Sequence, residues 1–524
     1  MTKQLFHLLD ALPQRYRFTG DRDIRITAPV VESATETEPG GVFVARAGGS
    51  FDGHDFIPQA IERGAAVIFG EKVVTGLPVP YILVENAQQA IGYLAAAYHD
   101  FPSRKLKMFG VTGTDGKTTT STLIHSILRE DSGGRAGLIS TIAADVGGQM
   151  LDTGLHVTTP NAPQIQALLA QMVDNGLRYA VVEMTSHGLA KGRVNGIDLD
   201  VAVLTNITHE HLNEHKTFEN YRAAKGRMFE MLNWNKPNKS NVGGVINFDD
   251  PNAYYFDQIC KSKGVLSEHY NLQQDPSFPW GVYAENLVYT SKSTEFDVSR
   301  TADGTFKLAS IHTSLVGEFN VMNILAAVAA VRLNRLVHAG SIERGIAAIK
   351  VIAGRMQRID EGQNFMALVD FAHTPNALEN VLKACRKMLP DGNRLIAIIG
   401  SAGLRDLDKR RMMPEVAARL ADFTILTAED PRSESLDEIL ETMAQAAVAA
   451  GGIEGETFMR VKDRGEALYR ACQMARGGDL VIACGKGHEQ SMAFGTTEYP
   501  WDDREAMRAA LRGTPLKTLP TAQA

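Results

Sequence analysis

The chain has 524 residues, too many for a single hydrophobic core, and this length predicts about three domains of ordinary size. Hydrophobic residues make up 44% and charged residues 22%, as is typical of a globular protein. The formal net charge of -7 provides no basic field for nucleic acid or for an anionic membrane surface. We therefore expect a protein that acts on small molecules and has no nucleic-acid partner.

The cysteine pattern and the N-terminal segment both favour a protein of the reducing cytosol. Cys260, Cys385, Cys472 and Cys484 are scattered without close pairs, which predicts neither a disulfide framework nor a zinc site. No window reaches about 18 consecutive apolar residues, and the N-terminus lacks a basic head followed by an unbroken apolar run. We expect a cytoplasmic protein without a membrane span.

Residues 1–103 alternate short apolar segments with helical patterns, which predicts a small α/β domain. Its strands are expected at 40–45, 65–70 and 80–85, and its helices at 54–64 and 87–100. The segment 101–107 has the composition of a linker to the next domain.

A second α/β series extends over residues 104–352. Polar clusters end its apolar strands, which are expected within 106–113, 136–141, 178–188, 200–211 and 243–250. A β-rich stretch at 280–317 and a helix at 319–336 follow. Because ligands bind at the carboxyl edge of open parallel sheets, these polar clusters predict a binding site.

The last part, residues 353–524, repeats the α/β pattern. Its strands are expected at 365–372, 394–400, 423–430 and 479–487. We expect the tail at 513–524 to be disordered. The sequence therefore predicts an α/β protein of three domains.

A glycine-rich run, "GVTGTDGKTTT" at 110–120, follows the first strand of the second domain. Successive backbone N–H groups of such a loop can point at phosphate oxygens, and the following helix adds its positive end. The strict P-loop pattern does not fit, because Gly110 stands one residue too early. The predicted nucleotide-binding loop comprises Gly113, Thr114, Asp115, Gly116, Lys117, Thr118 and Thr119, in which Lys117 supplies a charge and the threonine hydroxyls are candidate Mg²⁺ ligands.

Two further strand ends carry groups that suit a metal-phosphate site. Glu183 follows one apolar strand, and His209, Glu210, His211 and His215 follow the next. A lone histidine or a charged strand end is usually structural, but together they favour a site for metal and phosphate. Their spacing is not that of a zinc motif.

The order of the motifs resembles that of the Mur ligases, the ATP-dependent amide-forming enzymes of peptidoglycan synthesis. The matching segments are Gly-Thr-Asp-Gly-Lys-Thr-Thr at 113–119, Glu-x-x-Ser-His-Gly at 183–188, Thr-Asn-x-x-x-x-His-Leu at 205–212, "YRAAKGRMF" at 221–229, "GEFNVMNILAA" at 317–327, "GRMQRI" at 354–359, "DFAHTPNAL" at 370–378 and "GKGHE" at 485–489. The early Gly110 belongs to the form of the loop found in this family. The resemblance implies a central P-loop-type ATPase domain and a Rossmann-like C-terminal domain.

The resemblance also implies a chemistry. A substrate carboxylate attacks the γ-phosphate of ATP, and an amine then displaces phosphate from the acyl phosphate, so the site needs cations more than a protein nucleophile. Lys117, Lys225 and His211 match the catalytic residues, and Lys225 matches a lysine that carries CO₂ as a carbamate. The implied metal-holding residues are Thr118, Glu183, His211 and Lys225. Asn323 matches a residue near the adenine, and Arg355 and Asp370 match groups that reach the nucleotide when the domains close.

The acceptor implied by the resemblance is UDP-linked muramoyl dipeptide, bound between the first two domains. Its matching residues are Ser33, Thr158, Thr159, Thr185, Lys191 and Arg193. Lys191 stands where the family often has glutamine. The other departures from the family pattern are Glu32 for Asp, Ala34 for Arg, Asp115 for Asn, Asn213 for Asp, Phe371 for Tyr and Asn376 for Asp.

The third domain resembles those of family members that add a diamino acid. Arg432, in Glu-Asp-Pro-Arg at 429–432, matches an arginine that pairs with the distant carboxylate of meso-diaminopimelate. Arg405, Gly485 and Glu489 match further contacts. Asp430 replaces an amide, which favours lysine or ornithine unless Asp430 pairs with Arg432. We favour meso-diaminopimelate slightly, because the arginine and "GKGHE" are both present.

Two alternatives of other kinds remain. Folylpolyglutamate synthase shares the loop and the chemistry, but its members lack an N-terminal domain of this kind and the "EDPR" and "GKGHE" segments. A non-catalytic Mur homologue would need a damaged site, whereas Lys117, Glu183, His211 and Lys225 are all present. The expected partners are small molecules, and we expect a monomer.

Overall fold

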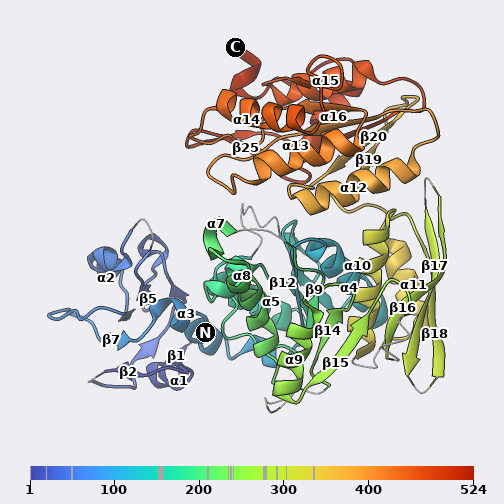
Figure 1. Cartoon of the computed structure of the whole chain (residues 1–524). Helices are drawn as coiled ribbons and strands as arrows, with labels where there is room; N and C mark the ends of the chain where they lie inside the picture. Colours follow the sequence, from blue (N-terminus) through green and yellow to red (C-terminus); the bar gives the residue numbers. More distant parts are fainter. Residues whose placement is uncertain are drawn as a thin grey trace.

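A computed structural model describes residues 2–18, 20–48, 51–151, 159–208, 212–233, 235, 239, 241–274, 280–290, 293–302, 304–333 and 337–523. His211 and Thr158, like His209 and Glu210, lie outside these residues. The chain forms an N-terminal, a central and a C-terminal α/β unit, whose main sheets lie within residues 16–84, 107–313 and 357–484. In Figure 1 the N-terminal unit lies beside the central unit and the C-terminal unit lies above it.

The N-terminal unit is a mostly parallel sheet between helices. Its elements are α1 (Leu5–Leu9), β2 (Tyr16–Arg17), β4 (Val30–Val31), β5 (Val42–Ala45), α2 (Ile57–Glu62), β6 (Val67–Gly70), β7 (Tyr81–Val84) and α3 (Ala87–Tyr98), with a separate pair β1 (Lys3–Gln4) and β3 (Arg25–Ile26). The sheet order is β2-β7-β6-β5-β4. Alternate strand residues face opposite layers: Val42 and Val44 pack toward α3, whereas Phe43 packs toward α2.

The central unit contains the longest sheet, of order β11-β10-β9-β12-β8-β13-β14-β15-β16-β17-β18. Its strands are β8 (Lys107–Thr112), β9 (Ala136–Ile139), β10 (Ala144–Asp145), β11 (Met150–Leu151), β12 (Tyr179–Glu183), β13 (Val201–Leu204), β14 (Gly243–Asn247), β15 (Leu266–Tyr270), β16 (Gly281–Tyr289), β17 (Thr294–Ala302) and β18 (Gly304–Thr313). The strands from β9 to β16 in this order are parallel, and both ends of the sheet are antiparallel.

Helices cover both faces of the central sheet, which explains why its strands are continuous apolar runs. The helices are α4 (Lys117–Ser132), α5 (Ala162–Asp174), α8 (Phe218–Glu230), α9 (Ala253–Lys263), α10 (Glu318–Leu333) and α11 (Ala339–Ala348). Phe109 and Val111 of β8 pack with α4, α10 and α11, while Met108 packs on the opposite face with α5, α8 and α9. The carboxyl ends of β8, β12 and β13 therefore meet at one edge.

The C-terminal unit is a second doubly covered sheet, of order β19-β20-β24-β21-β22-β23. Its elements are β19 (Gln357–Ile359), β20 (Met366–Asp370), α12 (Pro375–Met388), β21 (Leu395–Ile399), α13 (Lys409–Leu420), β22 (Phe423–Leu426), α14 (Leu436–Ala449), β23 (Phe458–Arg460), α15 (Arg464–Met474), β24 (Leu480–Cys484), the hairpin β25 (Ser491–Phe494) and β26 (Thr497–Pro500), and α16 (Asp503–Leu511). The helices α12, α13 and α14 cover one face, and α15 and α16 cover the other. This arrangement is Rossmann-like, with β24 inserted between β20 and β21.

The expected disorder of the tail is wrong for its described part, which ends at residue 523. Leu519 is buried, and Leu516 packs against the core under α15 and α16. The Thr521 hydroxyl, within the short 3-10 helix η4 (Pro520–Gln523), donates to the Asp463 carboxylate at 2.9 Å. Packing of Leu516 and Leu519 therefore orders a segment whose proline and threonine content predicted disorder.

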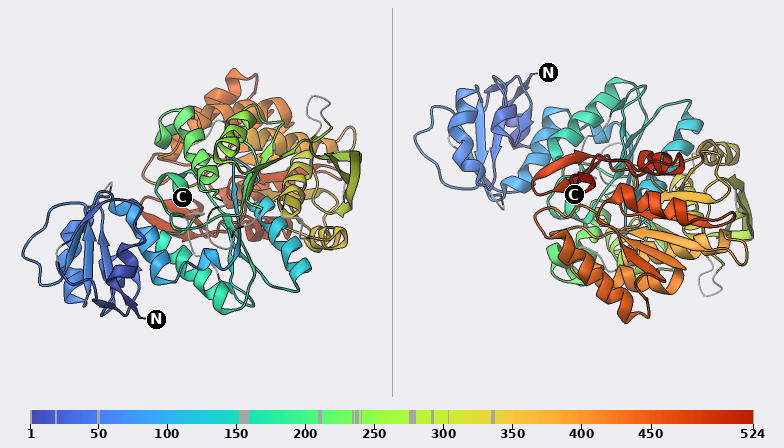
Figure 2. Two further views of the ribbon diagram at one scale, coloured as in Figure 1. Left: turned by 90° about the horizontal axis from the view of Figure 1, so that it is seen from below. Right: turned by 90° about the horizontal axis from the view of Figure 1, so that it is seen from above.

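The N-terminal unit contacts the central unit through α3, which packs against α5. The Gln88 side chain donates to the Lys191 carbonyl at 2.8 Å, and the Asn195 side chain donates to the Gln89 carbonyl at 3.2 Å. Figure 2 shows the N-terminal unit set to one side of the other two units from below and from above. In the part of the chain that the structure describes, none of the helices has the length and hydropathy needed to cross a membrane.

Candidate active site

The predicted phosphate loop joins β8 to α4, and two of its glycines are required by their surroundings. Gly113 and Gly116 have φ values of +152° and +81°. A Cβ at Gly113 would lie 1.8 Å from the Thr205 hydroxyl oxygen, and one at Gly116 would lie 2.3 Å from the Asn323 side-chain oxygen. Because α4 begins at Lys117, the loop ends at the positive end of a helix.

Lys117 lies over the loop that precedes it. Its Nζ donates to the carbonyl oxygen of Thr114 at 2.8 Å and to that of Gly113 at 3.2 Å. The positive charge of the Lys117 ammonium therefore lies beside the loop backbone and at the start of α4. This is the arrangement expected of a phosphate-binding lysine.

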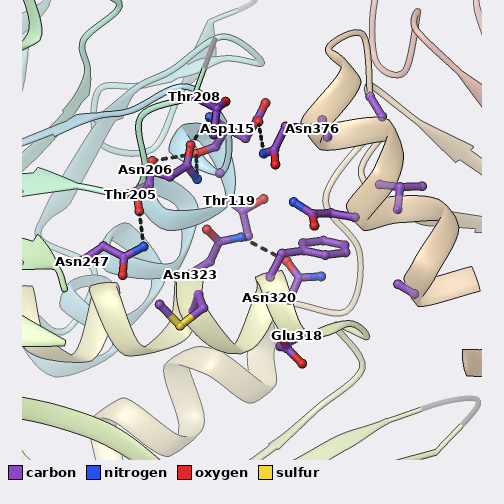
Figure 3. Close-up of a pocket in the computed structure, with 18 of the residues that line it drawn as sticks. Asp115, Thr119, Thr205, Asn206, Thr208, Asn247, Glu318, Asn320, Asn323 and Asn376 are labelled. Atoms are coloured by element: carbon purple, nitrogen blue, oxygen red, sulfur yellow. Dashed lines mark hydrogen bonds between the residues drawn. The ribbon is translucent and has the colours of Figure 1, made fainter. Parts of the chain in front are cut away.

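The Thr-Asn pair that follows β13 holds the loop in place. The Thr205 hydroxyl donates to the Asp115 carbonyl at 2.6 Å, and the Asp115 N–H donates to the Asn206 side-chain oxygen at 2.9 Å. The Thr114 N–H donates to the Asn206 carbonyl at 2.8 Å. Figure 3 shows Asp115, Thr205 and Asn206 grouped at one side of the pocket. Sequence analysis identified this pair only as a family motif, and the contacts give it a role in fixing the loop.

Glu183, at the end of β12, is buried beside the first turn of α4. Both of its carboxylate oxygens lie 3.1 Å from the Thr118 hydroxyl. The N–H and the hydroxyl of Thr141 donate to Oε2 at 3.1 and 3.0 Å. Thr141 was missed by sequence analysis, because it lies 42 residues from Glu183 and no motif marks it.

The Thr118 and Glu183 oxygens are hard donors of the kind that Mg²⁺ prefers, and their proximity fits a magnesium ion bound together with nucleotide phosphates. Among the described residues, no three His, Cys, Asp or Glu side chains gather into a metal site. His211, the other histidine expected here, lies outside those residues.

Lys225 of α8 is buried at the same loop, with 2% of its surface exposed. Its Nζ donates to the Gly113 carbonyl at 2.5 Å and lies 4.5 Å from the centre of the Tyr221 ring. The alternative of a solvated surface lysine is therefore wrong. Burial of a lysine without a function would be costly, so the position supports a role in the site.

A cavity of about 720 Å³ lies between the central and C-terminal units. Asn323 lines it from α10, and its Nδ2 donates to the Asn320 side-chain oxygen at 3.3 Å (Figure 3). The Thr120 hydroxyl of α4 donates to the Asn323 Oδ1 at 3.2 Å. Side chains from the phosphate loop, the ends of β13 to β15, Arg355, residues 370–373 and α12 complete the lining. The cavity therefore adjoins Asp115, Gly116, Thr118 and Thr119 of the phosphate loop.

Two side chains of the C-terminal unit reach the phosphate loop. Arg355 donates from Nη2 to the Thr118 hydroxyl at 3.2 Å, and its guanidinium lies 4.6 Å from the centre of the Phe371 ring. The Asn376 amide donates to the Asp115 carboxylate at 3.2 Å (Figure 3). Asp115 and Asn376 both depart from the family pattern, and here these two departures contact each other.

Asp370 lines the cavity, but its carboxylate is engaged by backbone. Its two oxygens accept from the N–H groups of Met356 at 2.7 Å and Ala372 at 2.8 Å. Burial raises the pKa of Asp370 above its ordinary value, although the nearby Arg355 opposes this shift. Asp370 therefore positions the segment that carries Arg355.

The expected acceptor-binding residues are only partly brought together. The Thr159 hydroxyl lies 3.0 Å from that of Thr185 and donates to the Glu183 carbonyl, and Arg193 donates to the Thr159 carbonyl at 2.8 Å. Lys191 follows α6 (Ser186–Ala190). Ser33 lies in the N-terminal unit, where its hydroxyl contacts that of Thr35 at 2.8 Å.

The expected amino-acid contacts gather at the carboxyl edge of the C-terminal sheet. Asp430 does not pair with Arg432, as one alternative proposed; its Oδ1 accepts from Lys486 Nζ and from the Ala493 N–H, both at 2.9 Å. In the described structure, the one hydrogen bond of the Arg432 guanidinium is a long one, 3.5 Å to the Gly403 carbonyl. Arg405 lies 3.7 Å from Glu214 of α7 (Leu212–His215) in the central unit.

The backbone at this edge is strained in a way that is common at functional sites. Asp430 and Arg432 have φ values of +41° and +53°. The Arg432 N–H donates to the Ala493 carbonyl at 3.1 Å, and the Gly495 N–H donates to the Arg432 carbonyl at 2.8 Å. The hairpin of β25 and β26 therefore holds Arg432 in this conformation.

Comparison with known proteins identifies the family. Three family models match successive parts of the chain: Mur ligase family, catalytic domain, at 33–99; Mur ligase middle domain at 111–331; and Mur ligase, glutamate ligase domain, at 354–487. The chain is 41% identical over 496 residues to UDP-N-acetylmuramyl-tripeptide synthetase of Roseiflexus sp. (strain RS-1), with 92% of this chain and 94% of that protein covered. This chain belongs to the Mur ligase family and is an ATP-dependent amide-forming ligase.

Other relatives carry a more particular name. The chain is 37% identical over 508 residues to UDP-N-acetylmuramoyl-L-alanyl-D-glutamate--2,6-diaminopimelate ligase of Bacillus licheniformis, with 97% of this chain and 99% of that protein covered. A solved structure of a ligase with the same name superposes with a TM-score of 0.66 at 27% identity, over 98% of this chain and 99% of that chain. The predicted three-domain Mur ligase fold is thereby confirmed.

Proposed function

We propose that this chain adds meso-diaminopimelate to UDP-N-acetylmuramoyl-L-alanyl-D-glutamate, using ATP, in peptidoglycan biosynthesis. The observation that carries the proposal is the convergence of Lys117, Thr118 and Glu183 beside the interdomain cavity. The near full-length relatives named as diaminopimelate ligases support the choice of amino acid.

The residues suit a reaction in which negative charge moves twice. The acceptor carboxylate attacks the γ-phosphate of ATP to form an acyl phosphate, and the amine then displaces phosphate through a tetrahedral intermediate. Lys117 and Arg355, the latter 3.2 Å from the Thr118 hydroxyl, supply positive charge at the transferred phosphoryl group. Thr159, Thr185 and Arg193 hold the acceptor, with Ser33 and Lys191 at its uridine and sugar ends.

The magnesium site in this proposal is built around Thr118 and Glu183, with His211 and Lys225 assigned by resemblance. A bound Mg²⁺ would neutralise the phosphate oxygens. Thr141 orients the Glu183 carboxylate by its two hydrogen bonds. A carbamate on Lys225 would convert the buried cation beside Gly113 into an anion that supports a second Mg²⁺.

In the C-terminal unit, Arg432 binds the far carboxylate of the amino acid, and Arg405, Gly485 and Glu489 contribute further contacts. The guanidinium of Arg432 has only the long hydrogen bond to Gly403 within the described structure, so it can form a bidentate pair with a ligand. Asp430 shapes this site through Lys486. Asn323 and Asp370 belong to the nucleotide side of the cavity.

Phosphate release is the test of this proposal. The enzyme is supplied with ATP, Mg²⁺, UDP-linked muramoyl dipeptide and either meso-diaminopimelate, lysine or ornithine, and we expect the fastest release with meso-diaminopimelate. Faster release with lysine or ornithine would identify a ligase for a basic amino acid. Release only with a folate and glutamate would identify a folylpolyglutamate synthase. Absence of release with every set would favour a non-catalytic homologue.

The domain boundaries near residues 103 and 352, a monomeric state and a cytoplasmic location remain proposals. The family models support the boundaries, because they end at 99 and 331 and begin again at 111 and 354. Light scattering during size-exclusion chromatography tests the monomer. We expect a mass close to 57.1 kDa.

The carbamate makes a specific prediction at Lys225. Lys225→Ala should lower kcat by at least about 100-fold, because it removes the group that carries the second metal-supporting charge. Short carboxylic acids should partly restore activity by replacing the carbamate oxygens. Incubation with ¹³C-labelled bicarbonate should give a carbamate NMR signal in the wild type and none in the variant.

Lys263→Ala is the matched control, because Lys263 is an exposed lysine on α9. It should retain wild-type activity and the carbamate signal. Rescue of Lys225→Ala by short amines, instead of carboxylic acids, would show that Lys225 acts as an ordinary cation.

A further inference from the structure

His187 belongs to the Glu-x-x-Ser-His-Gly segment at 183–188 and has no role in the reaction described above. It lies in the first turn of α6, the short helix that follows β12. Thr185, which is assigned to the acceptor, caps this helix, since its hydroxyl accepts from the Gly188 N–H at 3.0 Å. His187 is therefore held beside a residue of the proposed acceptor site.

Glu214 of α7 joins His187 to the C-terminal unit. Its Oε2 contacts the Nε2 of His187, and its Oε1 lies 3.7 Å from the Nη1 of Arg405, a residue assigned to the incoming amino acid. In Figure 1, α7 lies on the side of the central unit that faces the C-terminal unit. The His187–Glu214 pair therefore lies where groups assigned to the acceptor and to the amino acid come together.

Neighbouring side chains fix the helices that carry this pair. The Ser186 hydroxyl lies 3.1 Å from the Nε2 of His215, and the rings of His187 and His215 meet edge to face with their centres 5.8 Å apart. Arg227 of α8 donates to the Ala190 carbonyl, in the last residue of α6, at 2.9 Å. The relative position of His187 and Glu214 is therefore built into the packing of α6, α7 and α8.

The surroundings of His187 keep its imidazole neutral at pH 7. Burial lowers the pKa of His187 below its ordinary value; Lys191, His215 and Arg193 reinforce this shift, whereas Glu214 opposes it. A neutral imidazole can accept a proton, and a carboxylate beside its other nitrogen stabilises the imidazolium that forms.

The other charged groups around the pair keep one charge state near neutral pH. Burial lowers the pKa of His215, and the Lys225 charge reinforces this shift, so its imidazole is neutral as well. Arg193, Arg227 and Arg405 carry guanidinium groups, which stay positive. A proton taken up at this place near pH 7 is therefore assigned to the His187–Glu214 pair.

The second step of the proposed reaction needs such a proton acceptor. At neutral pH an amino acid presents its amine as an ammonium group, which has no lone pair with which to attack an acyl phosphate. Lys117, Arg355 and Arg405 are cations and cannot take this proton. A neutral imidazole beside a carboxylate can.

We propose that His187 is the general base that takes a proton from the reacting ammonium group of the incoming amino acid, with Glu214 as its positioning residue. This inference rests on the proposed function. Because Nε2 faces Glu214, Nδ1 accepts the ammonium proton, and the amine lone pair then forms the C–N bond to the acyl carbon. The tetrahedral intermediate breaks its C–O bond to phosphate, the departing phosphate takes the second amine proton, and the imidazolium returns its proton to solvent.

Hydroxylamine separates the base from the other functions of the site. It is largely unprotonated at neutral pH and attacks an acyl phosphate without a base, so hydroxamate formation from ATP, Mg²⁺ and UDP-linked muramoyl dipeptide reports acceptor binding and the first step. His187→Gln should lower kcat with meso-diaminopimelate about 100-fold and keep hydroxamate formation within about threefold of the wild-type rate. His312→Gln, a change of an exposed histidine on β18, should leave both rates unchanged.

The pH dependence is a second measurement. In the wild type, kcat with meso-diaminopimelate should be nearly constant between pH 7 and pH 8, because His187 is neutral throughout this range. In His187→Gln, only amine that is already unprotonated reacts, and its fraction rises about tenfold per pH unit in this range. The loss of activity relative to the wild type should therefore shrink about tenfold from pH 7 to pH 8.

Glu214→Gln tests the positioning residue. It should lower kcat about tenfold and move the acidic limb of the kcat profile to lower pH, because the Glu214 charge raises the pKa of His187. A merely structural role would lower kcat at every pH without moving the limb. Glu219→Gln, an exposed change in the first turn of α8, should keep the wild-type profile.

The outcomes separate this inference from the proposed function. Equal losses of ligation and hydroxamate formation in His187→Gln, no loss of either, or a loss that does not change with pH would overturn the assignment of His187. If His187→Gln does not fold, Glu214→Gln decides, and an acidic limb that does not move would overturn the assignment. A wild type that forms no hydroxamate and releases no phosphate with any diamino acid would instead refute the proposed function.

Discussion

Lys117→Ala is expected to lower kcat by at least about 100-fold while leaving the protein folded. Lys117 lies at the start of α4 and, among the described residues, donates to the loop carbonyls of Gly113 and Thr114, so it contributes little to the core. In the proposed reaction it neutralises charge that develops on the phosphoryl group, and loss of one such cation costs on the order of 3 kcal/mol in transition-state stabilisation. Phosphate release under saturating substrates measures the effect.

Lys105→Ala is the control for this change, because Lys105 is exposed just before β8. It should behave as the wild type. Thermal unfolding should give similar Tm values for both variants and the wild type. A Lys117→Ala enzyme that keeps a tenth of the wild-type rate would show that the loop has a structural role and not the proposed catalytic one.

Arg432→Ala is expected to abolish the preference for meso-diaminopimelate. A desolvated charge pair contributes roughly 2 to 5 kcal/mol, so KM for meso-diaminopimelate should rise at least about 30-fold. Lysine has no carboxylate at its far end, so its KM should stay nearly constant. Competition between equimolar diaminopimelate and lysine, followed by mass analysis of the products, measures the change in preference.

Arg419→Ala provides the control, since Arg419 is exposed in the last turn of α13. The left-handed backbone at Arg432 costs an alanine about as much as an arginine, so the change should not relax the site by itself. An equal loss with both amino acids would mean that Arg432 maintains the fold of the edge. A wild-type preference for lysine would reverse the assignment of the substrate.

Much of the fold could be predicted, because the central strands are buried on both faces and their apolar runs are unambiguous. β8, β12, β13 and β14 lie within the predicted segments, and their polar ends do meet at one edge. The tail was not predictable from composition, because two leucines that pack under α15 and α16 outweigh its prolines.

The site was predictable where one short segment carries several of its groups, as in the phosphate loop. Contacts between distant segments were not predictable. Thr141 and Glu183 are 42 residues apart, and Asp115 and Asn376 are 261 residues apart. Asp430 was expected to face the amino acid, but a lysine and a backbone N–H already bind its carboxylate. The adjacent Glu429 has a buried carboxylate oxygen without a hydrogen-bond partner among the described residues, a feature that is visible only in three dimensions.

The hydrogen bonds from Arg355 to Thr118 and from Asn376 to Asp115 join the C-terminal unit to the residues that would bind the nucleotide. Occupancy of the cavity and orientation of the two units are therefore thermodynamically linked. A nucleotide that takes over these side chains shifts the distribution of orientations. By reciprocity, any constraint on orientation, such as a crosslink between α10 and α12, alters nucleotide affinity by the same free energy.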